Sequence, residues 1–235
     1  MPASLPEGDF MTITTIVFDA YGTVFDVGGA ARIASAEPGG EALAENWEQV
    51  SRDWRTKQLE YTWLRSIAGH HIDFGHVTAD ALTWTLEKAG LSDPDLRARL
   101  LALYDTLPAF PEAREVLADL KAKGRNVAIL SNGAPEMLDR AVESAGIGGS
   151  LDAVLSAEAA GVYKPDARVY DLVGQRFGCQ KNEVLFVSSN FWDIAGAAGY
   201  GFITAWVNRH GEPRDRLWSR PTHELPDLTH IAEFA

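Results

Sequence analysis

The sequence predicts an α/β fold in which a parallel β-sheet forms the core and a helical cap is inserted after the first strand. Short apolar runs alternate with amphipathic stretches of helical length over most of the chain, a pattern typical of strand–helix–strand units. The alternation stops between residues 28 and 108, where the periodicity is helical throughout. We therefore expect a core domain formed by residues 11–27 and 109–235, and a cap domain formed by residues 28–108.

Each element of the core is predicted from a short stretch. The expected strands are TITTIVF (12–18), NVAIL (126–130), AVLSA (153–157), EVLFVSS (183–189) and FITAWV (202–207). Their apolar character is typical of strands buried on both faces. The expected helices are PEAREVLADLKAKG (111–124), PEMLDRAVESAG (135–146) and PDARVYDLVGQRFG (165–178). Each begins with a first-turn proline, Pro111 in the first case, and stops at a glycine.

The inserted stretch is predicted from its periodicity. Leu43, Trp47, Val50 and Trp54 recur at intervals of 4, 3 and 4 residues, which predicts one amphipathic helix. TADALTWTLEKAG (78–90) and DPDLRARLLALY (93–104) predict two more helices. The chain is expected to return to the core near Phe110.

Composition excludes several classes of function. The net charge of -12 argues against a nucleic-acid surface, which needs clustered Lys and Arg. No apolar run approaches the ~20 residues of a membrane span, and the first residues lack the basic-then-apolar order of a secretory signal. Cys179 is the only cysteine, so no internal disulfide is possible and a cytoplasmic location is expected.

Polar side chains follow the ends of the predicted strands. Because ligands bind beyond the carboxyl ends of the strands in an open parallel sheet, we expect these side chains to share one edge. Any one of them alone is typical of a turn or a solvated surface, but four such groups at one edge predict a site. In chain order they are Asp19 with Thr23, Ser131 with Asn132, Lys164 with Tyr170, and Ser188 with Ser189, Asn190 and Asp193.

Several motifs resemble those of a known enzyme family. DAYGT, LSNG, VYKPD and FVSSNFWD resemble the four motifs of the haloacid dehalogenase superfamily. RTKQLEYTWLRS (55–66) and DFGHVTADAL (73–82) resemble the L-2-haloacid dehalogenases in particular, and the resemblance extends from Met11 to about Arg209. It implies a Rossmann-like core with a helical cap, a homodimer, and hydrolysis of 2-haloalkanoic acids by a nucleophilic aspartate and water.

Asp19 alone is open to three interpretations, as a turn residue, a metal ligand or a nucleophile. A phosphate-handling loop with two acids spaced by one residue would have its second acid at position 21, which is Tyr21 here. Halide leaves without a proton, so a dehalogenase does not need that acid. Phosphatases also need Mg²⁺ held by carboxylates, whereas after the fourth strand only Asp193 is acidic. We therefore expect a nucleophile, and neither a metal nor a cofactor.

The chemistry assigns roles around Asp19. Two unit charges about 4 Å apart repel by roughly 4 kcal/mol at an effective dielectric near 20, so Lys164 is expected to offset the approach of an anionic substrate. Thr23 and Ser188 are expected to hold the carboxylate oxygen that does not attack. Attack gives an ester, and an L substrate gives a D-2-hydroxy acid by inversion. Asp193 is the expected base for the hydrolytic water, helped by Asn190, Lys164 and Tyr170.

The resemblance also assigns the parts of the substrate. It implies that the substrate carboxylate binds Ser131 and the backbone N–H groups of Ala20 and Tyr21. It implies that Arg55 binds the departing halide, with Asn132 as a helper. The apolar wall around the alkyl group is expected from Tyr21, Leu59, Phe74 and Trp192. The alternative interpretation is that these residues form the seam between core and cap, and the two roles are compatible.

Two other functions compete with this one. A phosphatase or phosphonate hydrolase of the same superfamily would depend on magnesium and would tolerate Tyr21. A relative without catalytic activity would act as a binding module, but the presence of the full set argues against it: Asp19, Arg55, Lys164, Asn190 and Asp193.

Overall fold

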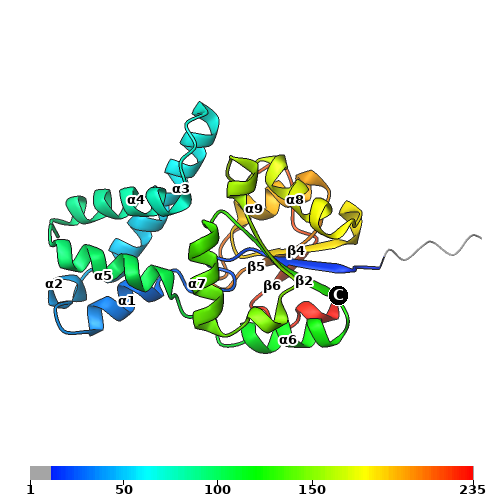
Figure 1. Ribbon diagram of the computed structural model, residues 1–235, viewed down its shortest axis with the longest axis horizontal. Helices are drawn as coiled ribbons and strands as arrows, with labels where there is room; N and C mark the ends of the chain where they lie inside the picture. Colours follow the sequence, from blue (N-terminus) through cyan, green and yellow to red (C-terminus); the bar gives the residue numbers. More distant parts are fainter. Residues whose placement is uncertain (1–11, 235) are drawn as a thin grey trace, which may run out of the picture.

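The computed structural model describes residues 12–234, and its core is a six-stranded sheet in which every paired strand runs parallel to its neighbour (Figure 1). The strand order is β3-β2-β1-β4-β5-β6, so β1 lies between β2 and β4. Residue 11, where the predicted core domain begins, lies outside the described residues. The strands are β1 (Thr15–Phe18), β2 (Asn126–Ser131), β3 (Ala153–Ser156), β4 (Val184–Ser188), β5 (Ile203–Val207) and β6 (His223–Leu225).

Four helices cover the two faces of the sheet. Figure 1 shows α8 (Ala167–Phe177) and α9 (Phe191–Tyr200) on one face, and α6 (Ala113–Ala122) with α7 (Pro135–Ala145) on the other. Both faces are therefore buried, which explains why the strands are almost wholly apolar. Short 3₁₀ turns complete the core at Gly148–Ser150, Ala157–Ala160, Lys181–Glu183 and Ile231–Glu233.

Five helices follow β1 and form a separate layer beside the sheet (Figure 1). The longest, α3, ends where Gly69 adopts a left-handed conformation, with φ 69°, and α4 begins after Asp73, whose side chain accepts from the His76 N–H. The helices are α1 (Gly29–Ala36), α2 (Glu41–Ala44), α3 (Trp47–Ala68), α4 (Phe74–Ala89) and α5 (Pro94–Asp105). This layer is the helical cap inserted after the first strand.

The two chain segments that join cap and core lie side by side. Phe25 and Ala109 form an antiparallel bridge. The Asp26 N–H donates to the Pro108 carbonyl at 2.9 Å, and the Phe110 N–H donates to the Val24 carbonyl at 2.9 Å. The chain therefore leaves the core and returns to it as one paired ribbon.

A second contact joins cap and core on another part of their boundary. Glu158, after β3, faces the loop between α3 and α4. One of its carboxylate oxygens lies 2.7 Å from His71 Nε2, and the other accepts from the Phe74 N–H at 2.9 Å. The Tyr163 hydroxyl donates to the Ile72 carbonyl at 2.5 Å. The cap is thus bonded to the core here as well as along the ribbon.

The elements predicted from sequence are confirmed, with three corrections. The strand β6 has no prediction, because its three residues are too short to form a pattern. Pro111 lies before α6 rather than in its first turn, and α8 likewise begins at Ala167, capped by Asp166. The stripe from Leu43 to Trp54 is divided between α2 and α3, because the chain leaves the helix after Ala44.

No helix within residues 12–234 combines the length and the apolar composition needed to cross a membrane.

Gly196 in α9 provides a test of the packing between α8 and α9. A Cβ at this position would lie 2.5 Å from the Tyr170 hydroxyl oxygen and 2.6 Å from Pro165 Cβ. We expect Gly196→Ala to lower the free energy of unfolding by about 1–3 kcal/mol, since the crowded groups are not flexible. Urea unfolding followed by circular dichroism measures the change.

The matched control is Gly174→Ala in α8. Its Cβ would meet only the Cys179 carbonyl, at 3.8 Å. Because alanine favours a helix over glycine, we expect this variant to be unchanged or more stable by up to about 1 kcal/mol. Equal effects of the two substitutions would contradict the packing argument.

Candidate active site

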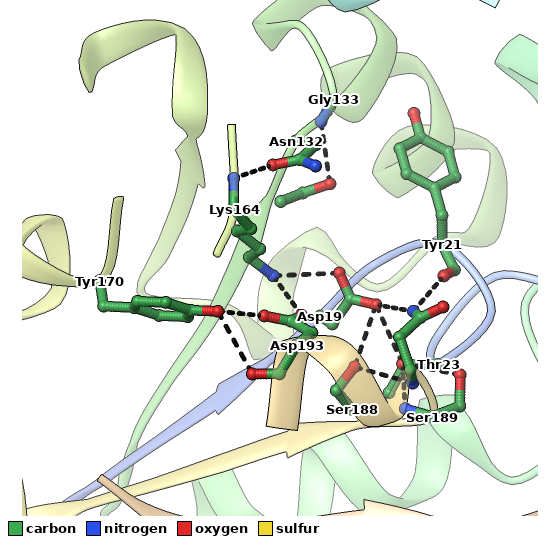
Figure 2. A network of polar contacts seen from close by, with 12 residues as sticks. Asp19, Tyr21, Thr23, Asn132, Gly133, Lys164, Tyr170, Ser188, Ser189 and Asp193 are labelled. Carbon is green, nitrogen blue, oxygen red and sulfur yellow. Dashed lines mark hydrogen bonds and ion pairs between the residues drawn. The ribbon is translucent and has the colours of Figure 1, made fainter. Parts of the chain in front are cut away.

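The carboxyl ends of the strands bring polar side chains together, as Figure 2 shows. In β1, Phe18 pairs with Ile129 of β2 and with Val187 of β4. This register places Asp19, just after β1, beside the ends of β2 and β4. Ser131 ends β2 and Ser188 ends β4, while Lys164 follows β3.

Asp19 is 5% exposed, and its two carboxylate oxygens have different surroundings. Oδ2 accepts from Asn190 Nδ2 at 2.8 Å, from Thr23 Oγ1 at 3.2 Å and from Ser188 Oγ at 3.4 Å. Oδ1 accepts from Lys164 Nζ at 3.1 Å. One oxygen is therefore held by three neutral donors, and the other faces a single ammonium (Figure 2).

Lys164 joins Asp19 to a second buried carboxylate. Its Nζ donates to Asp193 Oδ2 at 2.8 Å, and the side chains of Lys164 and Asp193 are both 0% exposed. Tyr170 donates to Asp193 Oδ1 at 2.7 Å. Burial raises the pKa of Asp193 to about 6, an effect that the Lys164 ammonium opposes and the charge of Asp19 increases.

The end of β2 supplies polar groups next to Lys164. Asn132 Oδ1 accepts from the Lys164 backbone N–H at 2.9 Å, which fixes the amide and turns its nitrogen to the other side. Ser131 Oγ accepts from the Gly133 N–H at 3.0 Å. Among residues 12–234, neither the Asn132 amide nitrogen nor the Ser131 hydroxyl donates a hydrogen bond to the protein.

The loop after Asp19 presents backbone N–H groups. The Ala20 carbonyl accepts from the N–H groups of Thr23, Val24 and Phe25, which curls the loop, and Gly22 allows the turn with φ 91°. Within the described part of the chain, the N–H groups of Ala20 and Tyr21 donate to no protein acceptor. Adjacent free N–H groups of this kind suit an anion.

Arg55 reaches this loop from the cap. Its Nη2 donates to the Tyr21 carbonyl at 3.3 Å, and its Nη1 donates to Gln58 Oε1 at 2.8 Å. No carboxylate of residues 12–234 forms an ion pair with Arg55. The guanidinium therefore carries an uncompensated positive charge beside Asn190, which itself contacts Asp19.

The four residues expected to form one apolar wall lie in two places. Leu59 and Trp192 line a cavity of about 840 Å³ between cap and core, together with Arg55 and Asn190. Tyr21 and Phe74 are buried and do not line this cavity. Their rings stack with centroids 5.6 Å apart. The seam between cap and core thus has an inner aromatic layer and an outer open cavity.

Three residues of the network have no role in the sequence analysis. The Ser189 N–H donates to Thr23 Oγ1 at 2.8 Å, which orients the hydroxyl beside Asp19. Gln58 and Tyr104 lie behind Arg55. Gln58 stands three residues after Arg55, a spacing that places both on one helix face. Tyr104 comes from α5, and nothing in the sequence connects it with Arg55.

No group of three or more His, Cys, Asp and Glu side chains suited to a metal ion occurs within residues 12–234. The two carboxylates of the site, Asp19 and Asp193, are joined by the Lys164 ammonium. A cation placed between them would meet this buried positive charge.

Comparisons with known proteins agree with the motifs. Residues 13–201 match the family model of haloacid dehalogenase-like hydrolases. The chain is 41% identical to an (S)-2-haloacid dehalogenase of Pseudomonas sp. (strain YL) over 94% of each protein, and 41% identical to (S)-2-haloacid dehalogenase 4A of Burkholderia cepacia, again over 94% of each.

A solved structure extends the comparison to the fold. The L-2-haloacid dehalogenase of Xanthobacter autotrophicus with covalently bound chloropropionic acid is 36% identical, with a TM-score of 0.85 over 94% of this chain and 98% of that one. Sequence, fold and the residues at the strand ends thus lead to one conclusion. The chain belongs to the L-2-haloacid dehalogenase family of the haloacid dehalogenase superfamily.

Proposed function

We propose that the protein hydrolyses L-2-haloalkanoic acids to D-2-hydroxy acids through an ester on Asp19, without a metal ion. The observation that carries the proposal is a buried aspartate paired with the Lys164 ammonium at 3.1 Å. Tyr21 stands where a proton-donating acid would serve an alkoxide leaving group. A halide needs no such donor.

Asp19 Oδ1 is the attacking oxygen in this mechanism. Oδ2 is held by Asn190, Thr23 and Ser188, so its lone pairs are directed to these donors. Lys164 pairs with Asp19 and offsets its repulsion from an anionic substrate. Attack on C2 from the side opposite the halide inverts the configuration, so the L acid gives the D product.

The substrate carboxylate binds Ser131 and the backbone N–H groups of Ala20 and Tyr21. The support for this role is that these groups donate to nothing else in the described chain. The departing halide is stabilised by Arg55, whose charge has no carboxylate partner there, and by the amide nitrogen of Asn132. Leu59 and Trp192 contact the alkyl group from the side of the cavity. Tyr21 and Phe74 form the buried aromatic layer on the inner side of the site.

Hydrolysis of the ester releases the product and restores Asp19. Water attacks the ester carbonyl, so one oxygen of Asp19 afterwards comes from water. Asp193 accepts the proton, because its raised pKa makes it a stronger base than an exposed aspartate. Tyr170 and Lys164 fix the Asp193 carboxylate, and Asn190 holds the carbonyl end of the ester.

The protein is further proposed to act as a cytoplasmic homodimer with a core domain of residues 11–27 and 109–235 and a cap domain of residues 28–108. The paired ribbon at Phe25 and Ala109 supports the two domain boundaries. Leu64 and Ile67 on α3 are 54% and 84% exposed, which supports contact with a second copy. Sedimentation analysis would identify a monomer.

Asp19 is expected to be essential for the release of halide. We expect chloride release from L-2-chloropropionate, with no change on addition of EDTA. Asp19→Asn removes the nucleophile and should lower the rate by about 10⁴-fold or more. A chloride electrode measures the release. Magnesium-dependent release of phosphate from phosphate esters, with no chloride from any small haloacid, would show a phosphatase instead.

The ester intermediate predicts where water oxygen first appears. In a single turnover in water enriched in the heavy oxygen isotope, the label should enter Asp19 and be absent from the hydroxy acid. Mass spectrometry of the peptide that contains Asp19 detects it. Label found directly in the product would mean that water attacks C2 without an ester.

The pKa of Asp193 predicts the acid limb of the pH profile. The ionised form is the base, so kcat should be constant well above pH 6 and fall about tenfold per pH unit below it. Asp193→Asn should slow hydrolysis of the ester more than its formation, so the ester accumulates. A pH profile of kcat without a break near pH 6 would contradict the assignment of the base.

A further inference from the structure

We propose that Gln58 of α3 is a positioning residue that directs the Arg55 guanidinium toward the departing halide, and that Tyr104 of α5 holds Gln58 in place. The inference rests on the proposed function, since binding of halide by Arg55 belongs to it. It adds that the packing inside the cap determines how well the enzyme stabilises the departure of a poor leaving group such as chloride, compared with bromide.

Gln58 is buried with every part of its amide in use. The side chain is 1% exposed, although glutamine is rarely buried to this extent. Oε1 accepts from Arg55 Nη1 at 2.8 Å. Nε2 donates to Thr78 Oγ1 at 2.7 Å and lies 3.1 Å from the Tyr104 hydroxyl. A buried polar network that is fully satisfied is rigid.

The orientation of the amide follows from its partners. A reversed Gln58 would turn its NH₂ group toward Arg55, and both groups would be donors. The Thr78 and Tyr104 hydroxyls can each donate or accept, and Tyr104 also donates to Gln58 Oε1 at 3.2 Å. The guanidinium, which can only donate, therefore selects the orientation in which the oxygen faces Arg55.

A neutral partner positions Arg55 without cancelling its charge. The guanidinium donates to two neutral oxygens, Gln58 Oε1 and the Tyr21 carbonyl. They occupy two of its five N–H donors and leave the others for an anion. A carboxylate in place of Gln58 would hold Arg55 equally well but would neutralise the charge that a departing halide needs.

Tyr104 connects this network to the rest of the cap. Its ring packs between Tyr21, with centroids 5.3 Å apart, and Trp54, at 4.9 Å. Burial raises the pKa of its hydroxyl, which therefore stays protonated and neutral. Since Gln58, Thr78 and Tyr104 come from α3, α4 and α5, the position of Arg55 depends on the packing of three helices.

The test compares kcat/KM for L-2-chloropropionate and L-2-bromopropionate, because this ratio reports the steps up to halide departure. Gln58→Met keeps the volume and removes the hydrogen bonds. We expect kcat/KM to fall about 10–100-fold on the chloro acid and less on the bromo acid, since bromide leaves more easily. The preference for bromide over chloride should therefore increase.

Two further variants separate position from charge. Gln58→Glu should also increase the bromide preference, because it neutralises Arg55 while keeping the contact. Tyr104→Phe removes only the hydroxyl and should give a smaller increase in the bromide preference. If Gln58→Met does not fold, Tyr104→Phe tests the positioning role in its place. The control is Thr85→Val on α4, whose buried hydroxyl donates only to the Ala81 carbonyl of its own helix, and it should leave the preference unchanged.

The outcomes distinguish this proposal from the function on which it rests. If the parent protein releases halide but the variants at positions 58 and 104 keep its bromide preference, the positioning role is wrong and the proposed function stands. If the parent protein releases no halide from either acid, both proposals are wrong.

Discussion

The site depends on the ammonium of Lys164 lying between two buried carboxylates. Desolvation of charges is costly unless each is paired, and Asp19, Lys164 and Asp193 pair at 3.1 and 2.8 Å. Removing the lysine would leave two like charges together without water. The two carboxylates nevertheless differ in their surroundings, because Asp193 is completely buried whereas Asp19 is 5% exposed. One physical constraint thus distinguishes the proposed nucleophile from the proposed base.

Several residues of the site could be predicted from the sequence because each is located by the short strand that precedes it. Asp19, Ser131 and Ser188 stand at the end of an apolar run or directly after it, and a parallel sheet brings such ends together. Lys164 lies further along the chain, beyond the 3₁₀ turn Ala157–Ala160 that follows β3. The apolar wall could not be resolved in the same way. Tyr21 and Phe74 look like Leu59 and Trp192 in sequence, but burial, which separates them, is a property of the assembled cap and core.

The residues behind Arg55 show a second limit of the sequence. Gln58 and Arg55 share a helix face, so their contact follows from spacing alone. Tyr104 is 46 residues from Gln58, and their contact exists only because α3 and α5 pack together. Short strands are not predicted from the sequence for another reason. The strand β6 has three residues, and its place in the sheet depends on its pairing with β5 rather than on its own composition.

Two of the contacts between cap and core lie on separate parts of their boundary, and this affects how small molecules reach the site. The ribbon at Phe25 and Ala109 ties one part of the boundary, and Glu158 with His71 ties another. Swinging the cap away would break the second set of bonds on every turnover. The cavity bordered by Arg55 and Trp192 lies on the same boundary and also borders Asn190, whose amide donates to Asp19. A small molecule in this cavity is therefore one side chain away from the Asp19 carboxylate while both ties are intact.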